Sequence, residues 1–193
     1  MKYENIENLY EQSEYVESSC SRAKNIRDVY ILKMCKSNDF APSDLKKEIC
    51  FAKKAEKHGV GPKINKYGFY EKIGFIEMEK MKTSLKKLLE DDKLTNYHVK
   101  SLKKVLKKMW KRGNFLHMDL HADNIWFDKK NQAKLIDFGY VQHDYNNNDI
   151  TTAKKDLINS SYDVHSLIEF LLPTSKKSQE LLKLKEVMSG SWM

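Results

Sequence analysis

The spacing of apolar and polar residues along the first part of the chain predicts strands around one helix. Val29–Leu32 is rich in β-favouring residues and predicts a strand that carries Lys33. Apolar residues recur at helical spacing at positions 45, 49, 52 and 55, and Ser43 or Asp44 is the expected N-cap. The Gly- and Pro-containing segment His58–Pro62 should end this helix. Strands are expected next at residues 63–70 and 74–79.

Helical periodicity dominates from residue 84 onward. A linker at residues 80–83 precedes a short helix near 84–91, and the clearest helix spans residues 96–112. One face of this helix is apolar and the other carries seven Lys or Arg residues; the apolar members are Val99, Leu102, Val105, Leu106, Met109 and Trp110. The pattern therefore predicts an α+β chain.

Three further features complete the predicted architecture. Two short apolar runs around a polar turn at residues 128–132 predict a hairpin over residues 125–136. An amphipathic helix is expected near residues 162–171, ended by Pro173. A hinge near residue 80 would separate a strand-rich lobe from a helical lobe, and ligands usually bind in a cleft of that kind.

Length and composition restrict the class of protein. A chain of 193 residues with 40% hydrophobic residues suits one domain or two small lobes. No run of about 18 apolar residues occurs, so no membrane span is expected, and the polar, acidic N-terminus does not resemble a secretory signal. Three Cys without a CxxC pair predict neither a disulfide framework nor a zinc knuckle. We expect a reducing, cytoplasmic setting.

The net charge of +8 favours anionic partners, which include nucleotides, acidic proteins, nucleic acids and phospholipids. We interpret the basic face of the helix at 96–112 as a solvated surface, with docking of acidic protein substrates as the alternative. A nucleic-acid partner also stays open.

Residues 117–128 read HMDLHADNIWFD, and DFG follows at 137–139. A packed core gains nothing from such a polar cluster. Phosphoryl transfer, in contrast, needs a cation for the phosphates, oxygen ligands for magnesium, and a carboxylate that orients the attacking hydroxyl. A zinc site built from His117, His121 and Asp119 is the alternative, but it would leave Asn124 and DFG unexplained.

These motifs resemble those of the protein-kinase-like superfamily. His117–Asp119 stands where that superfamily has HRD, and Asn124 follows five residues after Asp119, as in HRDxxxxN. Asp137–Gly139 is DFG, and Tyr30–Lys33 resembles the strand that ends in the phosphate-binding Lys. Glu48 would be the ion-pair partner of that Lys. The resemblance covers about residues 10–170 and implies a bilobal kinase-like fold with a small antiparallel-sheet N-lobe.

The resemblance also implies the cofactors ATP and Mg²⁺ and a set of residue roles. Asp119 would orient the substrate hydroxyl, while Asn124 and Asp137 would hold magnesium. Lys33 would contact the phosphates and would be positioned by Glu48. In this interpretation the catalytic residues are Asp119, Lys33 and Glu48.

An adenine site is implied where the strand at 74–79 enters the hinge. The backbone of Glu79 and Met81 would bond the adenine edge, and Met78 would be the gatekeeper. Ile31 stands where a small Ala usually forms the roof, and Trp126 stands where an aliphatic residue usually forms the floor. The larger roof and floor predict a narrow adenine slot, and the alternative is that Trp126 turns to stack on the base.

The chain departs from the superfamily pattern in its phosphate loop and in its distal part. Residues 10–20 occupy the place of the Gly-rich loop but contain no Gly, so a Ser-rich turn would hold phosphate, with Ser13, Ser18 or Ser19 as candidates. Met118 replaces the HRD Arg, His121 replaces the usual Lys, and no APE motif follows DFG. A truncated helical C-lobe is therefore expected.

The compact form resembles two kinds of atypical kinase. These are the reduced protein kinases of large DNA viruses and the small kinase of the tRNA-threonylcarbamoylation complex. The expected organisation is a single minimal kinase domain over residues 1–193, with an N-lobe at 1–79, a hinge at 80–82 and a reduced C-lobe at 83–193. The setting would be the host cytoplasm if the chain is viral.

The leading functional hypothesis is an ATP- and magnesium-dependent serine/threonine kinase that transfers the γ-phosphate to hydroxyls of a protein. His121 and the short C-lobe support an alternative, a small-molecule kinase of the aminoglycoside or choline type. The missing Gly-rich loop supports another, a pseudokinase that serves as a binding module.

Overall fold

The computed structural model describes residues 6–15, 22–36 and 42–141. The expected helix near 162–171 lies outside these residues, as do Ser18 and Ser19. No side chain is described for the predicted N-cap residues Ser43 and Asp44.

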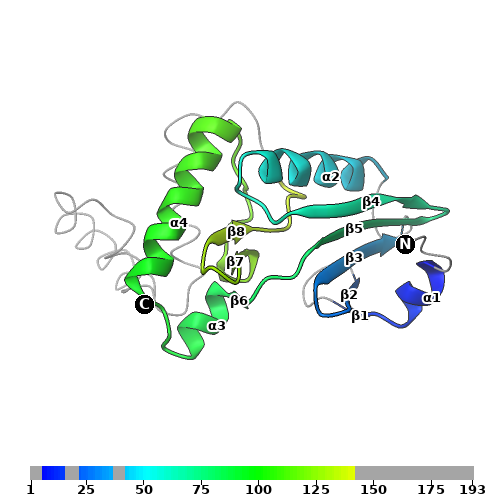
Figure 1. Cartoon of the computed structure of the whole chain (residues 1–193). Coiled ribbons are helices and arrows are strands. Elements are labelled where there is room, and N and C mark those ends of the chain that lie inside the picture. Colours follow the sequence, from blue (N-terminus) through cyan, green and yellow to red (C-terminus); the bar gives the residue numbers. More distant parts are fainter. Residues whose placement is uncertain (1–5, 16–21, 37–41, 142–193) are drawn as a thin grey trace, which may run out of the picture.

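A five-stranded antiparallel sheet forms the N-terminal part (Figure 1). Its spatial order is β1-β2-β3-β5-β4, and its strands are β1 (Glu14–Tyr15), β2 (Arg22–Ile26), β3 (Tyr30–Lys36), β4 (Ile64–Tyr70) and β5 (Ile73–Glu79). The three strands expected from the apolar pattern are confirmed. β3 continues past its apolar run to Lys36 because its whole length pairs with β5.

Each face of this sheet is covered by one helix, because successive strand residues point to opposite faces. The helix α1 (Ile6–Glu11), which the pattern did not predict, packs Ile6 and Tyr10 with Leu32 and Met34 of β3. The predicted helix is α2 (Pro42–Lys57), which covers the opposite face. There Leu45, Ile49 and Ile76 pack with Cys35, so the Cys35 thiol is buried in an apolar cluster.

The contact between α2 and β5 depends on Gly74. A Cβ added at Gly74 would lie 1.8 Å from Leu45 Cδ2, far inside contact distance. We expect Gly74→Ala to lower the free energy of unfolding by about 1–3 kcal/mol, the range for overpacking a core. Urea unfolding followed by circular dichroism would measure it.

Two further variants test the assignment of that effect to crowding. Leu45→Ala combined with Gly74→Ala should cost less than the sum of the two single substitutions, since the clash is absent from the double variant. Gly139→Ala is the control, because a Cβ there meets only Asp137 Oδ1 at 3.8 Å. Equal effects at Gly74 and Gly139 would contradict the packing argument.

Helix α2 ends at the predicted segment. Gly59 has φ +67°, a left-handed conformation that favours glycine. The backbone N–H groups of Val60 and Gly61 then donate to Ala55 O, which satisfies a carbonyl of the last helical turn.

The C-terminal part combines helices with a three-stranded antiparallel sheet of order β6-β7-β8. Its elements are β6 (Thr83–Ser84), α3 (Leu85–Glu90), α4 (Asn96–Lys108), a π-helical turn (Met109–Gly113), β7 (Ile125–Phe127) and β8 (Ala133–Leu135). The expected helix at 96–112 is thus α-helical only to Lys108. Its predicted apolar stripe is confirmed, since Leu102, Val105 and Met109 are buried in the main core.

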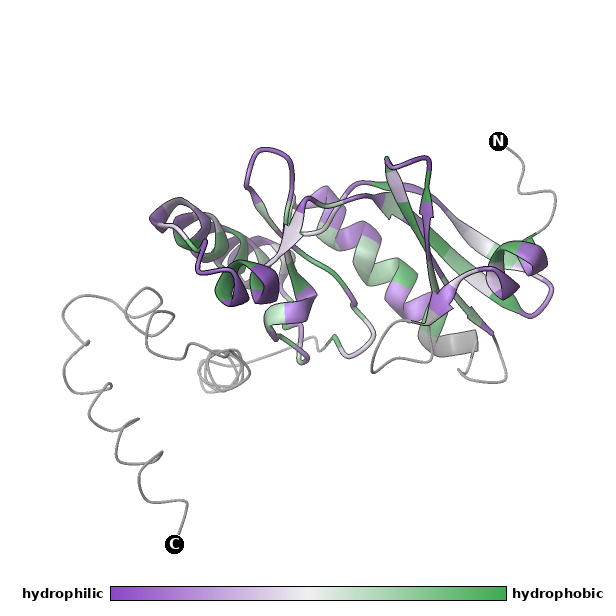
Figure 2. Cartoon of the chain, turned by 90° about the horizontal axis from the view of Figure 1, so that it is seen from below, coloured by the Kyte–Doolittle hydropathy of each residue, from purple (hydrophilic) through white to green (hydrophobic). Residues whose placement is uncertain are grey.

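Two backbone hydrogen bonds hold the linker between the two sheets. Lys80 N donates to Val29 O of the first sheet region, and Lys82 N donates to Phe127 O of β7. Figure 1 shows β7 and β8 between the five-stranded sheet and α4, which lies at the outer edge. Figure 2 shows hydrophobic residues along the strands, and hydrophobic and hydrophilic residues alternating around the helices.

The mixed α/β class with antiparallel sheets is confirmed. The division into lobes at 1–79 and 83–193 stays a prediction, because residues 142–193 lie outside the described part of the chain. None of the helices in the described ranges has the length and apolar character that crossing a membrane requires.

Candidate active site

Three charged side chains from separate elements meet between the two sheets. Lys33 Nζ, from β3, lies 2.8 Å from Glu48 Oε1 of α2 and 3.0 Å from Asp137 Oδ1, which follows β8. The exposed fractions are 14% for Lys33, 4% for Glu48 and 31% for Asp137. The cation is therefore shielded on the Glu48 side and reaches solvent on the Asp137 side, where a ligand can approach.

Electrostatics keep Lys33 protonated. Burial lowers the pKa of its ammonium group, but the charges of Glu48 and Asp137 outweigh burial and raise the pKa above its ordinary value. The pKa of Glu48 is raised, chiefly by burial and also by the charge of Asp137, while Lys33 opposes that shift. At neutral pH the Lys33 ammonium group therefore stays positively charged beside the Asp137 carboxylate.

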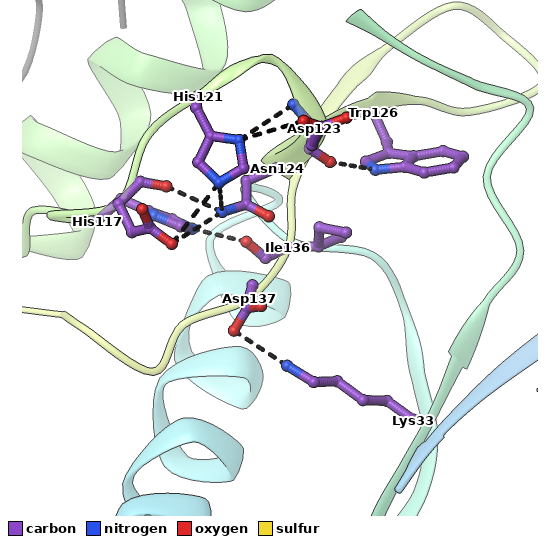
Figure 3. A network of polar contacts seen from close by, with 9 residues as sticks. Lys33, His117, His121, Asp123, Asn124, Trp126, Ile136 and Asp137 are labelled. Carbon is purple, nitrogen blue, oxygen red and sulfur yellow. Dashed lines mark hydrogen bonds and ion pairs between the residues drawn. The ribbon is translucent and has the colours of Figure 1, made fainter. Parts of the chain in front are cut away.

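The loop at 117–124 and the segment before Asp137 are joined through Ile136. His117 Nε2 lies 2.7 Å from Ile136 O, and Ile136 N donates to Asn124 O at 3.0 Å. His117 is buried, and burial lowers its pKa, so its neutral ring donates to this carbonyl. Its ring also packs against Phe138 at 5.2 Å. His117 thus has a structural role, because its contacts hold the segment that carries Asp137 next to the loop at 117–124 (Figure 3).

Asn124 organises the polar groups of this loop. Its side-chain nitrogen lies 2.9 Å from Asp119 O, 3.2 Å from Asp119 Oδ2 and 2.8 Å from His121 Nε2. The two amide hydrogens can donate to Asp119 O and Asp119 Oδ2, whereas the role of His121 Nε2 depends on the tautomer of its ring. Asp119 is 42% exposed, so its carboxylate is oriented by Asn124 yet open to a substrate.

Two residues of the site have left-handed backbone conformations. Met118 has φ +62° and Asp137 has φ +63°. Asp adopts this region at moderate energy, but Met rarely does. Backbone strain of this kind is common at functional sites. Met118 lies between His117 and Asp119, so its left-handed conformation sets the orientation of these two residues.

The segment that follows β5 contains one backbone donor without a partner. Glu79 N donates to Lys63 O at 2.9 Å, and the N–H groups of Lys80 and Lys82 are also bonded. Within the described residues, Met81 N–H makes no hydrogen bond, although Met81 is only 7% exposed. A buried amide without a partner is unfavourable unless a ligand accepts from it.

Ile31 and Met78 form a directly opposed pair of β3 and β5, so their side chains lie on the face that carries Lys33. A pocket of about 230 Å³, open solvent included, is lined by Glu48, Met78, Asp137 and neighbouring apolar residues. Ile31 and Trp126 do not line it.

The remaining predicted site residues have local partners. Trp126 Nε1 donates to Asp123 O at 2.6 Å, which fastens the indole to the loop (Figure 3). Ser13 Oγ donates to Tyr10 O at 2.5 Å, at the end of α1. Its part in phosphate binding stays a prediction.

The sequence predicted the charged groups of the site, but it did not show that the Met81 N–H lacks a protein partner, because no residue type encodes this. The two backbone hydrogen bonds of Ile136, to Asn124 and to His117, were missed for the same reason. For zinc, no cluster of three His, Cys, Asp or Glu side chains able to hold a metal ion occurs in the ranges described.

Two comparisons with known proteins found similar chains. The family model described as ABC1 atypical kinase-like domain matches residues 74–163. Among solved structures, the 2.2 Å crystal structure of WbdD matches with a TM-score of 0.57 and 20% identity, covering 72% of this chain and 35% of that chain. The chain thus spans about a third of WbdD, and at this identity the likeness shows the fold alone. The search of curated proteins found no match.

Neither comparison tests the resemblance to viral or tRNA-complex kinases, which stays a prediction. The chain has a mixed α/β fold that is consistent with a small kinase-like domain, and its residues 74–163 are similar to the ABC1 atypical kinase-like domain.

Proposed function

We propose that the chain is an ATP- and magnesium-dependent phosphotransferase that modifies Ser or Thr hydroxyls of a protein. The observation that supports this most is the chain of contacts from Glu48 through Lys33 to Asp137, at 2.8 and 3.0 Å. In this arrangement the buried Glu48 carboxylate holds the Lys33 ammonium group next to Asp137, which is partly exposed. The kinase-like fold agrees with phosphoryl transfer in general.

Each residue has a role that its contacts support. Lys33 would bind phosphate oxygens, with Glu48 holding its position. Asp119 would accept a hydrogen bond from the attacking hydroxyl and take its proton, because its carboxylate is exposed and is oriented by Asn124. The unpaired N–H of Met81 would donate to the adenine edge.

The acidic and amide groups suit magnesium. Asn124 and Asp137 offer oxygen ligands of the kind this ion prefers, and only one Asp137 oxygen is engaged by Lys33. Bound there, the ion would neutralise charge on the transferring phosphates. His117 and Asn124 would keep the two ligand-bearing segments in register through Ile136.

Transfer of radiolabelled γ-phosphate to the chain itself or to a generic protein substrate is the direct test. Transfer that requires magnesium and disappears in Asp137→Ala would support the proposal. No transfer, combined with no thermal shift on adding ATP and magnesium, would reject it in favour of a pseudokinase.

A small-molecule kinase is the second candidate, and His121 is the observation that favours it. His121 Nε2 lies 2.8 Å from the side-chain nitrogen of Asn124 and 3.7 Å from Asp119 Oδ2, so a small substrate bound at the Asp119 carboxylate would lie near the His121 ring. ADP release in a screen of hydroxylated metabolites and aminoglycosides separates the two. Turnover of a metabolite without protein labelling would favour this candidate.

The bulk of Trp126 leads to a prediction about adenine mimics. Because its indole is fastened to Asp123 O, it should not turn aside easily. Trp126→Leu should improve the affinity for broad planar adenine mimics on the order of tenfold, the factor given by about 1.4 kcal/mol of relieved overlap. Isothermal titration with a panel of such compounds would measure it. Ordinary affinity of the unchanged chain for the whole panel would contradict the narrow slot.

A further inference from the structure

The solvent face of α4 and of the turn that follows it carries many cations and no acid. From Asp92 to Asp119 the sequence contains no other Asp or Glu, and its basic residues are Lys93, Lys100, Lys103, Lys104, Lys107, Lys108, Lys111 and Arg112. Lys100, Lys104, Lys108 and Arg112 recur every four residues, which is about 6 Å along a helix. Like charges at this spacing destabilise a helix, so local stability does not explain them.

Tertiary structure adds a fifth cation from another element. Lys134 Nζ, from β8, donates to Gly59 O at 3.3 Å. Lys108 Nζ lies 3.2 Å from the position that a Cβ on Gly59 would take. Segments far apart in the sequence therefore bring Lys108 and Lys134 together at the C-terminal end of α2. We call Lys100, Lys104, Lys108, Arg112 and Lys134 the basic stripe.

The charge of the basic stripe is not neutralised within the described residues. None of its five side chains takes part in an ion pair there. The C-terminal end of α2 supplies only about half an opposing charge. The pKa of Lys108 is lowered, first by burial and then by the charges of Lys104, Lys134 and Arg112. The stripe is therefore a set of cations that repel one another until an anion arrives.

The stripe is separate from the candidate active site. Figure 1 shows α4 on the far side of β7 and β8 from the five-stranded sheet that carries Lys33. Among the large hydrophobic side chains exposed in the described part of the chain, Tyr97 belongs to α4 and lies about one turn before Lys100, and none lies between residues 100 and 112. The stripe therefore offers charge with one aromatic ring at its end, and no apolar patch along it.

We infer that the basic stripe binds the phosphodiester backbone of a nucleic acid without reading its sequence. Folded peptides and acidic protein segments usually need pockets or apolar anchors in addition to charge. Insertion into an anionic membrane likewise needs apolar side chains. A nucleic acid binds to cations alone, because neutralising its phosphates releases condensed counterions. A basic stripe along one helix is the expected footprint of such binding.

Fluorescence anisotropy with a labelled RNA and a labelled DNA duplex of arbitrary sequence tests this inference. Over about 50 to 200 mM salt, the logarithm of the affinity for the duplex should fall with a slope of about −4.5, as five phosphate contacts predict. The triple variant Lys100→Gln, Lys104→Gln, Lys108→Gln should bind on the order of 10²-fold more weakly, with a slope shallower by about 3. Gln keeps the helix propensity of Lys, so the melting temperature should not fall.

The matched control removes the same charge elsewhere. Lys63, Lys72 and Lys129 are exposed and lie outside the stripe, so Lys63→Gln, Lys72→Gln, Lys129→Gln should bind nearly as well as the unchanged chain. Equal weakening in both triple variants would overturn the inference, because net charge alone would then explain binding. So would the absence of salt-dependent binding to either nucleic acid.

Two other ligands identify a different occupant. If a poly-glutamate peptide or phosphatidylserine vesicles bind through the stripe while RNA and DNA do not, the partner is an acidic protein or a membrane, and the inference fails. No readout here uses phosphate transfer, so the result does not depend on the proposed function.

Discussion

Asp119→Asn should lower the turnover of phosphate transfer by about 10³-fold, within the 10²–10⁴ range typical of a general base. The substitution keeps the size of the side chain and its contact with Asn124 but removes the charge that accepts the hydroxyl proton. Because Asp119 does not contact Lys33, the KM for ATP should stay nearly unchanged. Steady-state kinetics at saturating substrate would measure both quantities.

Two neighbouring carboxylates serve as comparisons. Asp123→Asn, on the same loop, removes an exposed carboxylate that lies 3.4 Å from Lys86, and it should change turnover only slightly. Asp137→Asn should weaken nucleotide binding in the presence of magnesium as well as turnover, since Asp137 adjoins Lys33. If Asp119→Asn and Asp123→Asn lose activity equally, the assignment of Asp119 as the base is wrong.

The fold was predictable where local patterns and tertiary structure agree. The strand with Lys33, the helix with Glu48 and the hairpin at 125–136 have clear periodicities, and the structure contains all three. The strand β2 reads RAKNI, which lacks alternation, and it is a strand because it pairs with β3 along its length. The six-residue α1 is likewise too short for periodicity to reveal it; its stability comes from packing against the sheet.

The candidate site was predictable in its charges but not in its hydrogen bonds. The resemblance to kinases implied that Lys33 pairs with Glu48 and faces Asp137, and the structure brings these three side chains together. Backbone partners follow from three-dimensional arrangement alone. For this reason the bond from Trp126 to Asp123 could not be inferred beforehand, and only the resemblance to kinases implied that the Met81 backbone is available to adenine.

Glu48→Leu should lower the free energy of unfolding by about 3 kcal/mol, the lower end of the range for breaking a buried ion pair. The substitution leaves the Lys33 ammonium, 14% exposed, with Asp137 as its remaining carboxylate partner. That partner is itself partly exposed, which is why we expect the lower end. Urea unfolding would measure the loss, and Lys33→Met should partly restore stability in the double variant, because no buried charge then remains.

The pH dependence of Lys33→Met gives an independent check on the same pair. Without the cation, only burial and Asp137 act on Glu48, and both raise its pKa above the unfolded value. A raised pKa means that the folded chain binds a proton more readily than the unfolded chain. The contribution of Glu48 to the stability of this variant is therefore fully present below the pKa of Glu48 in the unfolded chain. It is lost as the pH rises through the pKa of Glu48 in the folded chain. Lys33→Met should accordingly lose more stability relative to the unchanged chain at neutral pH than at acidic pH, whereas a pH-independent loss would mean that Glu48 does not carry the buried charge.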